Sequence, residues 1–147
     1  MSDLTYYDFA IRSFNSINEQ LELAERIDWY NLFAPECEQI IEKLMKSILD
    51  LCSSDIVPDR LYKTHKLHVI AEFINARWSD TVDIAMVSWI ETFYFEARYP
   101  GEDSVIVTKD TALKLKDATL LEGHKLINLH THLVSTQTSF FSSENEE

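Results

Sequence analysis

The fold is decided by residues 33–52, FAPECEQIIEKLMKSILDLC. Apolar side chains recur there every three or four residues, which is the spacing of one face of an α-helix. This stripe is wider than the one formed by residues 4–24, and it therefore predicts a deeply buried helix. Pro35 lacks a backbone N–H and fits a first turn. We expect the helix to begin between Trp29 and Pro35 and to end near Cys52.

Helical spacing continues on both sides of this stretch. Residues 4–24 form an amphipathic stripe for which Asp3 is the expected N-cap. Residues 67–78 form another, and Thr64 precedes it as a residue type that favours the N-cap position. A fourth stripe covers residues 86–97 and is expected to stop at Tyr99, because the residue before a proline disfavours the α-helical region.

A long last helix is predicted to begin after Thr108 and to run to about residue 134. Residues 105–107 are short and β-branched, have no evident pairing partner, and are interpreted as an extended connector. Gly123 lies inside the last helix, where a glycine costs about 1 kcal/mol relative to alanine. It marks either a close contact between helices or a weak point.

The composition also favours helices. The 147 residues include two glycines and three prolines, and 46% of them are hydrophobic. β-sandwiches and dinucleotide-binding folds need more turn and phosphate-loop glycines than that. We therefore predict an all-α fold, an up-and-down four-helix bundle with a fifth helix, formed by residues 1–135 as a single domain. Residues 136–147 are predicted to be a polar, acidic, frayed tail.

Charge and cysteine content exclude several classes of protein. The chain has 25 acidic and 13 basic residues and a net charge of -12, a balance that repels phosphate backbones and argues against DNA as a partner. Cys37 and Cys52 are expected to be core residues rather than a disulfide framework. Neither a leader peptide nor a long apolar run is evident, so we expect a cytoplasmic protein without a membrane segment. His65 and His68 are three residues apart and could share a helix face, but a metal site needs several convergent ligands, so no metal is expected.

Three short motifs follow one another along the chain. Residues 39–46 read Gln-x-x-Glu-Lys-x-x-Lys, residues 64–67 read Thr-His-x-Leu, and residues 98–100 read Arg-Tyr-Pro. In this order and spacing they resemble prokaryotic single-domain members of the HEPN family, the "higher eukaryotes and prokaryotes nucleotide-binding" domain. The resemblance covers roughly residues 5 to 135. It implies a helical bundle that dimerises, and either a metal-independent endoribonuclease held in check by a neighbouring nucleotidyltransferase or a nucleotide-binding module without catalysis.

The ribonuclease motif of that family is an arginine with a histidine four to six residues later. Arg98 matches the arginine, but the three positions in question hold Glu102, Asp103 and Ser104. A histidine is suited to move a proton during RNA cleavage because its pKa lies near neutrality. Glu102 and Asp103 instead add negative charge where a phosphate would approach. We therefore assign no catalytic residue and expect no ribonuclease activity.

The resemblance suggests residues that could bind a nucleotide or phosphate, namely Arg98, Tyr99, Lys43 and His65, and residues with a structural role, namely Gln39, Glu42, Lys46, Thr64 and Pro100. Arg98 can meet a phosphate with a bidentate guanidinium, or it can form an ion pair with an acid of the second predicted helix. Glu42 and Lys43 are expected to form a structural ion pair. His65 also belongs to a small basic cluster, which is either a phosphate site or a solvated loop, and which comprises Arg60, Lys63, Lys66 and His68.

Three functions follow. The first is a HEPN module without ribonuclease activity that binds a nucleotide or serves as partner of a nucleotidyltransferase, with no other cofactor. The second is a ribonuclease toxin of a toxin–antitoxin pair with an altered site that uses His65 or Arg98, and the third is a plain protein-interaction module. Aromatic side chains occupy nearly the whole circumference of the fourth predicted helix, which cannot be fully enclosed in a small bundle. This predicts a homodimer with Phe95 and the Arg98–Pro100 corner near its two-fold axis.

Overall fold

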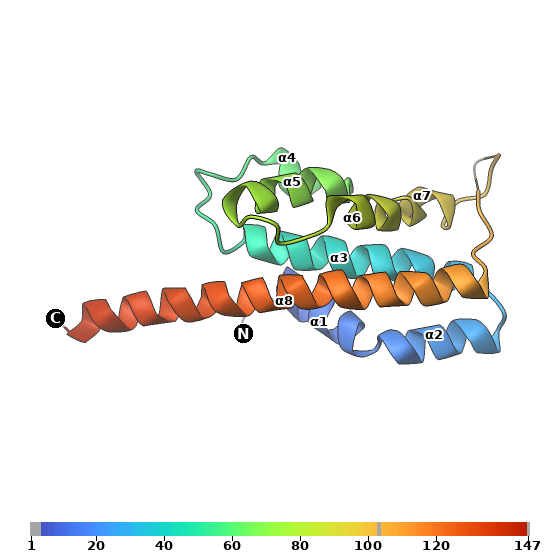
Figure 1. Ribbon diagram of the computed structural model, residues 1–147, viewed down its shortest axis with the longest axis horizontal. Coiled ribbons are helices and arrows are strands. Elements are labelled where there is room, and N and C mark those ends of the chain that lie inside the picture. The colour runs from blue at the N-terminus through green and yellow to red at the C-terminus, as the bar shows by residue number, and fades with distance from the viewer. Residues whose placement is uncertain (1–3, 103, 147) are drawn as a thin grey trace.

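Helices make up all of the regular structure in the described residues (Figure 1). The computed structural model describes residues 4–102 and 104–146, with side chains as far as residue 137. The elements are α1 (Tyr6–Asn15), α2 (Ile17–Arg26), the 3₁₀ helix η1 (Tyr30–Leu32), α3 (Ala34–Leu49), α4 (Arg60–Lys63), α5 (Leu67–Arg77), α6 (Ile84–Glu91), α7 (Phe93–Glu96) and α8 (Lys109–Glu146). The prediction of an all-α fold is confirmed.

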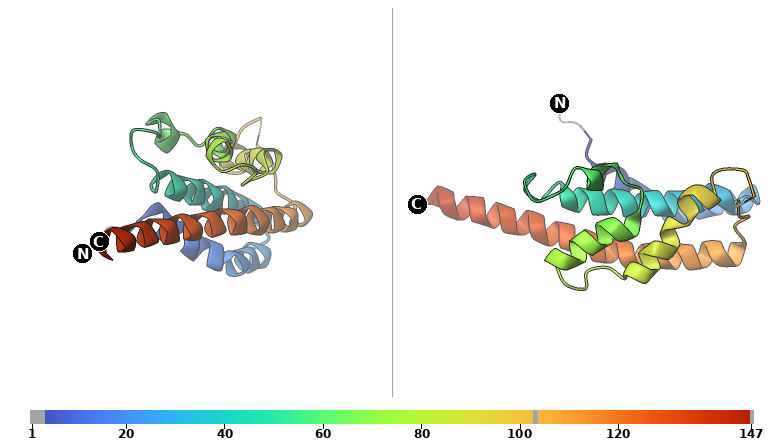
Figure 2. Two further views of the ribbon diagram at one scale, coloured as in Figure 1. Left: turned by 60° about the vertical axis from the view of Figure 1, so that its left-hand side comes forward. Right: turned by 90° about the horizontal axis from the view of Figure 1, so that it is seen from above.

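The helix α3 lies at the centre of the bundle. It runs beside α8, with α1 and α2 on one side of this pair and α5, α6 and α7 on the other (Figures 1 and 2). Pro35 stands in its first turn, as expected, and the helix ends at Leu49. Six of the largest fully buried side chains of the protein belong to α3, and they are Ile40, Ile41, Leu44, Met45, Ile48 and Leu49.

The two central helices run in the same direction. The Cys37 side chain near the start of α3 lies beside Thr119 of α8, and the Gln137 side chain of α8 donates to the carbonyl of Leu51, just beyond the end of α3. The helix α1 runs the opposite way, because the Tyr7 ring stacks on His130 at 3.9 Å. Between α3 and α5 the chain does not make a short antiparallel turn. Residues 50–66, which include α4, lead it back along the bundle (Figure 1).

Two of the expected helices are divided by hydroxyl side chains. Ser16 separates α1 from α2, and its hydroxyl donates to the carbonyl of Arg12 at 2.9 Å. Thr92 separates α6 from α7, and its hydroxyl donates to the carbonyl of Trp89 at 2.7 Å. Such side chains compete with backbone hydrogen bonds and interrupt helices. The N-cap of α1 is Thr5, whereas Asp3, the expected cap, lies outside the described residues.

One asparagine holds the connector that precedes α8. The Asn31 amide donates to the carbonyls of Ala97 and Val105, at 3.2 and 2.7 Å, and the backbone N–H of Val107 donates to its oxygen at 2.7 Å. The connector forms neither helix nor strand, and Thr108 accepts a hydrogen bond from the N–H of Thr111 at the start of α8. The helix continues to Glu146, and the division of the chain at residue 135 stays a prediction.

Gly123 of α8 marks a close contact between helices. A Cβ atom built there would lie 2.5 Å from Cε2 of Phe14 in α1 and 3.6 Å from Cδ1 of Leu44 in α3. Phe14 is itself buried, so its ring has little freedom to move aside. Of the two sequence interpretations of Gly123, the close contact is therefore the one observed.

We predict that Gly123→Ala lowers the free energy of unfolding by about 1–3 kcal/mol, because overpacking outweighs the gain in helix propensity of about 1 kcal/mol. Urea unfolding followed by circular dichroism measures it. Asn128→Ala, at an exposed position of the same helix, is the matched control and should leave stability unchanged or slightly raised. A Gly123→Ala protein as stable as this control would contradict the contact.

Candidate functional site

A row of buried charged side chains runs along α3. Glu38, Glu42 and Lys46 are spaced four residues apart and therefore share one face of the helix. They are 0%, 4% and 3% exposed. Charged residues are rarely buried to this degree unless they are paired, so this face is where a polar site lies within an otherwise apolar core.

Glu42 is the member of this row with the most partners. Its Oε2 accepts a hydrogen bond from Nζ of Lys46 at 3.2 Å, and its Oε1 lies 2.8 Å from Nδ1 of His65. The expected ion pair between Glu42 and Lys43 is wrong, because neighbouring residues of a helix point in different directions. The Lys43 ammonium instead lies 5.6 Å from the centre of the Phe9 ring of α1.

The segment between α4 and α5 presents His65 to this face. Thr64 does not cap α5, which begins at Leu67 after Lys66, but its hydroxyl accepts a hydrogen bond from the N–H of Lys66 at 3.0 Å. A carboxylate can only accept, so the hydrogen bond to Glu42 puts the proton of a neutral His65 ring on Nδ1 and leaves Nε2 as an acceptor. The His65 side chain is 45% exposed.

Arg98 stands against a group of aromatic rings. Its guanidinium lies 4.9 Å from the centre of the Tyr94 ring and 5.7 Å from that of Tyr99. The His65 ring stacks on the same Tyr94 ring at 4.4 Å, and Phe95 meets Tyr94 edge to face at 4.6 Å. We call this group, Arg98 with His65, Tyr94, Phe95 and Tyr99, the arginine–aromatic cluster.

The charge of Arg98 stays available. Within the described part of the chain it forms no ion pair within 4 Å, so the expected pairing with an acid of α3 is not a direct contact. Its side chain is exposed. Aromatic faces attract a guanidinium without neutralising it, and a planar guanidinium matches the oxygens of a phosphate.

Glu38 lies one turn before Glu42 on the same face of α3 and is fully buried. Burial and the nearby Glu42 carboxylate raise the pKa of Glu38 to about 9, and the Gln39 amide and the Arg98 charge lower that pKa by less. Nε2 of Gln39 donates to Oε2 of Glu38 at 2.7 Å, while the buried Oε1 has no partner among the described protein atoms. Burial beside a second carboxyl group therefore favours the protonated form of Glu38.

The structure brings most of the predicted residues together and leaves one apart. Glu42 contacts both Lys46 and His65, His65 stacks on Tyr94, and Arg98 and Tyr99 belong to the cluster itself. Pro100 lines a cavity of about 200 Å³ beside Phe95 and Tyr99. Lys43 is remote from the cluster and lines a separate cavity of about 400 Å³ against α1. The sequence interpretation missed Glu38 and the role of Tyr94, although the spacing of Glu38, Glu42 and Lys46 was a signal for the former.

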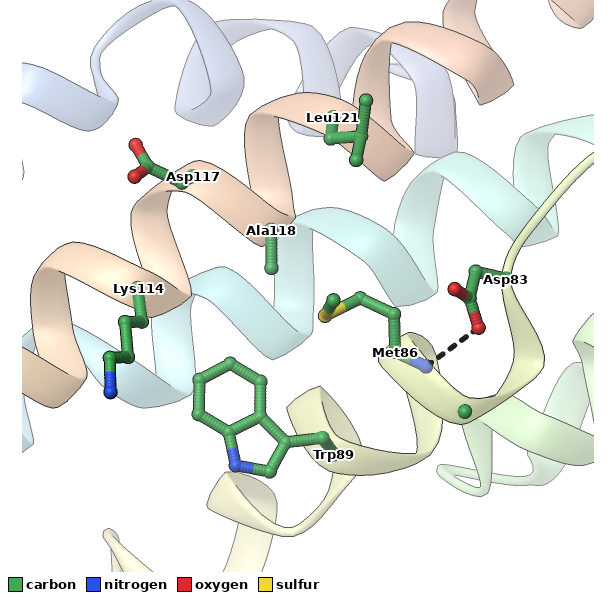
Figure 3. A pocket seen from close by; sticks show the side chains of 8 residues that line it. Asp83, Met86, Trp89, Lys114, Asp117, Ala118 and Leu121 are labelled. Carbon is green, nitrogen blue, oxygen red and sulfur yellow. Dashed lines mark hydrogen bonds between the residues drawn. The ribbon is translucent and has the colours of Figure 1, made fainter.

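A larger cavity of about 540 Å³ lies between α6 and α8. Trp89 and Met86 approach it from α6, and Ala118 lies across from them on α8 (Figure 3). Its charged lining residues, Asp83, Lys114 and Asp117, offer one cation beside two acids. This cavity is mainly apolar and lacks the convergent polar groups of the arginine–aromatic cluster.

Two other kinds of site are absent from the described residues. No group of three or more histidine, cysteine, aspartate or glutamate side chains is arranged to hold a metal ion. None of the described helices is both long enough and apolar enough to cross a membrane.

Comparison with known proteins gives one match. A family model described as "HEPN domain" matches residues 6–121, which include α1 to α7 and the first third of α8. Neither the curated proteins nor the solved structures contain a match to this chain.

Proposed function

This chain belongs to the HEPN domain family, and on that premise we propose that it is a HEPN module that binds the phosphate of a nucleotide and does not cleave RNA. The observation that carries the proposal is the unpaired guanidinium of Arg98, held against Tyr94 and Tyr99. A guanidinium for the phosphate and exposed aromatic faces for the base are the two kinds of contact that a nucleotide needs.

The residues after Arg98 support binding without cleavage. No histidine follows at four to six positions, and Glu102 is exposed there. A proton-transfer group at that place is what the ribonuclease motif of the family supplies. Without it, the contacts around Arg98 favour holding a phosphate over breaking a phosphodiester.

We predict that Arg98→Ala weakens binding of ATP at least tenfold, because a hydrogen bond to a charged group contributes about 1.5–3 kcal/mol. Isothermal titration calorimetry with ATP, and separately with inorganic phosphate, measures the change. Lys43→Ala is the matched control, since it removes one positive charge from α3 on the face directed to α1. Equal losses in the two variants would show that ATP responds to net charge, and unchanged binding in Arg98→Ala would reject this site.

A second candidate function rests on a specific observation. The Glu42 carboxylate orients His65, whose Nε2 is an acceptor, and His65 and Arg98 contact the same Tyr94 ring. A histidine and an arginine that contact one aromatic ring could support metal-independent RNA cleavage of the toxin type, with the histidine coming from another part of the chain than the family motif.

The two functions are separated by an RNA cleavage assay. We expect no cleavage above background when the purified protein meets defined oligonucleotides in the presence of EDTA. Cleavage that persists in EDTA and disappears in both His65→Ala and Arg98→Ala would establish the second candidate instead. Lys43→Ala should remain without effect in either case.

We further propose that the protein is a homodimer joined near the arginine–aromatic cluster. Large apolar side chains are exposed at this end of the bundle, with Phe95 at 64%, Tyr99 at 53% and Ile106 at 76%. A surface of this kind favours a protein partner. A nucleotidyltransferase is a second proposed partner, and if the protein dimerises but no nucleotide binds, a plain interaction module is the better description.

We predict that Phe95→Asp shifts the protein from dimer to monomer at micromolar concentration, because a charge at the centre of an interface is buried twice in a symmetric pair. Light scattering measures the mass. Leu121→Asp is the control, because Leu121 is 55% exposed and lies on α8 in the apolar cavity against α6. A native protein that runs as a monomer rejects the dimer, and a shift caused by Leu121→Asp alone moves the interface to α8.

A further inference from the structure

The cavity between α6 and α8 is a second place where a small molecule fits. Its volume of about 540 Å³ lies within the range of about 300–1,000 Å³ in which proteins bind small ligands, and such sites occur between the helices of bundles. We propose that this cavity binds a small aromatic amine, with the ring beside Met86 and Trp89 and the ammonium at Asp83. The residues that line it are distinct from the arginine–aromatic cluster, so this site goes beyond the proposed function.

The start of α6 is fixed against α8, which holds the two walls of the cavity in place. The backbone N–H of Asp83 donates to Oε1 of Glu122 at 2.7 Å, and Glu122 is 0% exposed, so this hydrogen bond is shielded from water. Across the cavity α8 presents Ala118, whose side chain is too small to fill the space opposite Met86 and Trp89 (Figure 3). Walls that are already in place reduce the ordering cost of binding a ligand.

Met86 and Trp89 form the apolar wall that α6 contributes. Figure 3 shows both side chains directed into the space between α6 and α8. An indole offers a large flat face to a second aromatic ring or to a cation, and a thioether makes favourable contacts with aromatic rings. Leu121 adds an apolar side chain from α8 that is 55% exposed. These side chains favour an aromatic group on the ligand.

The charged residues of the lining favour a cation. Two of them are acids, Asp83 and Asp117, and one is a base, Lys114. Within the described part of the chain none of these three side chains forms an ion pair. The lining therefore has an excess of negative charge, in a protein whose net charge is -12. Because clefts lined with negative charge concentrate cations, an amine is favoured over a neutral or anionic ligand.

Asp83 is the acid that is placed to receive the ammonium. Its Oδ1 accepts a hydrogen bond from the N–H of Met86 at 3.1 Å as the N-cap of α6, and its Oδ2 has no hydrogen-bond partner among the described residues. Lys114 lies at the other end of the cavity, beyond Trp89 (Figure 3). Since like charges repel, the ammonium lies at Asp83 and the ring lies at Met86 and Trp89.

The test titrates the wild-type protein with phenethylamine, and with phenethyl alcohol and phenylpropionate as neutral and anionic probes of similar size. Nitrogen–proton correlation NMR follows the indole N–H signals of the three tryptophans, Trp29, Trp78 and Trp89, and the spectrum of Trp89→Phe assigns the signal of Trp89. Trp89 is the one that lines the cavity. Phenethylamine should shift the Trp89 signal with a Kd on the order of 1 mM, as expected for a ligand of this size, and leave the other two in place. The other two probes should bind about three- to tenfold more weakly.

Two variants with the same loss of charge separate this site from the field of the whole protein. Asp83→Asn keeps a residue type that caps helices but removes the carboxylate, and it should weaken phenethylamine binding about three- to tenfold. Asp110→Asn, exposed in the first turn of α8 and outside the cavity, is the matched control and should bind phenethylamine as the wild type does. The inference is overturned by an unmoved Trp89 signal, by equal losses in the two variants, or by a phenethylamine affinity no higher than that of either other probe.

Discussion

The site depends on the buried carboxylate of Glu42. It lies inside α3 and takes its partners from two parts of the chain, Lys46 one turn along and His65 from the segment before α5. A buried charge of this kind is tolerated only when it is paired and hydrogen-bonded. Because His65 in turn stacks on Tyr94, the pairing of one carboxylate fixes how α3, α7 and the segment before α5 pack together.

The aromatic rings explain how a strongly acidic protein can keep a usable cation. The net charge is -12, and a surface arginine in such a chain has many carboxylates within reach of a flexible side chain. Tyr94 and Tyr99 attract the guanidinium of Arg98 through their ring faces, which carry partial negative charge but accept no proton and form no salt bridge. The family match shows the domain type, and the contacts of Arg98 with Tyr94 and Tyr99 are what the structure adds to it.

The apolar stripes predicted the fold well, because a helix that buries one face repeats its apolar residues every three or four positions. The width of the stripe around Ile40, Leu44 and Ile48 placed α3 at the centre, and Gly123 marked a contact that only a residue without a side chain allows. The breaks at Ser16 and Thr92 were missed, since hydroxyls form alternative hydrogen bonds inside apolar stripes that otherwise read as continuous. In the candidate site, the motifs pointed to Arg98, Tyr99 and His65, and their role stays a prediction, whereas Glu38 was not singled out because the burial of a charged side chain depends on tertiary packing.

The amide of Asn31 has a consequence for recognition. It joins the 3₁₀ helix η1 to both ends of the segment that contains Arg98 and Tyr99, through the carbonyls of Ala97 and Val105 and the N–H of Val107. A free surface loop would lose conformational entropy each time it closed on a ligand. Here the two ends of the segment are fixed by hydrogen bonds when the protein folds, which lowers the entropy that Arg98 and Tyr99 lose when a ligand binds.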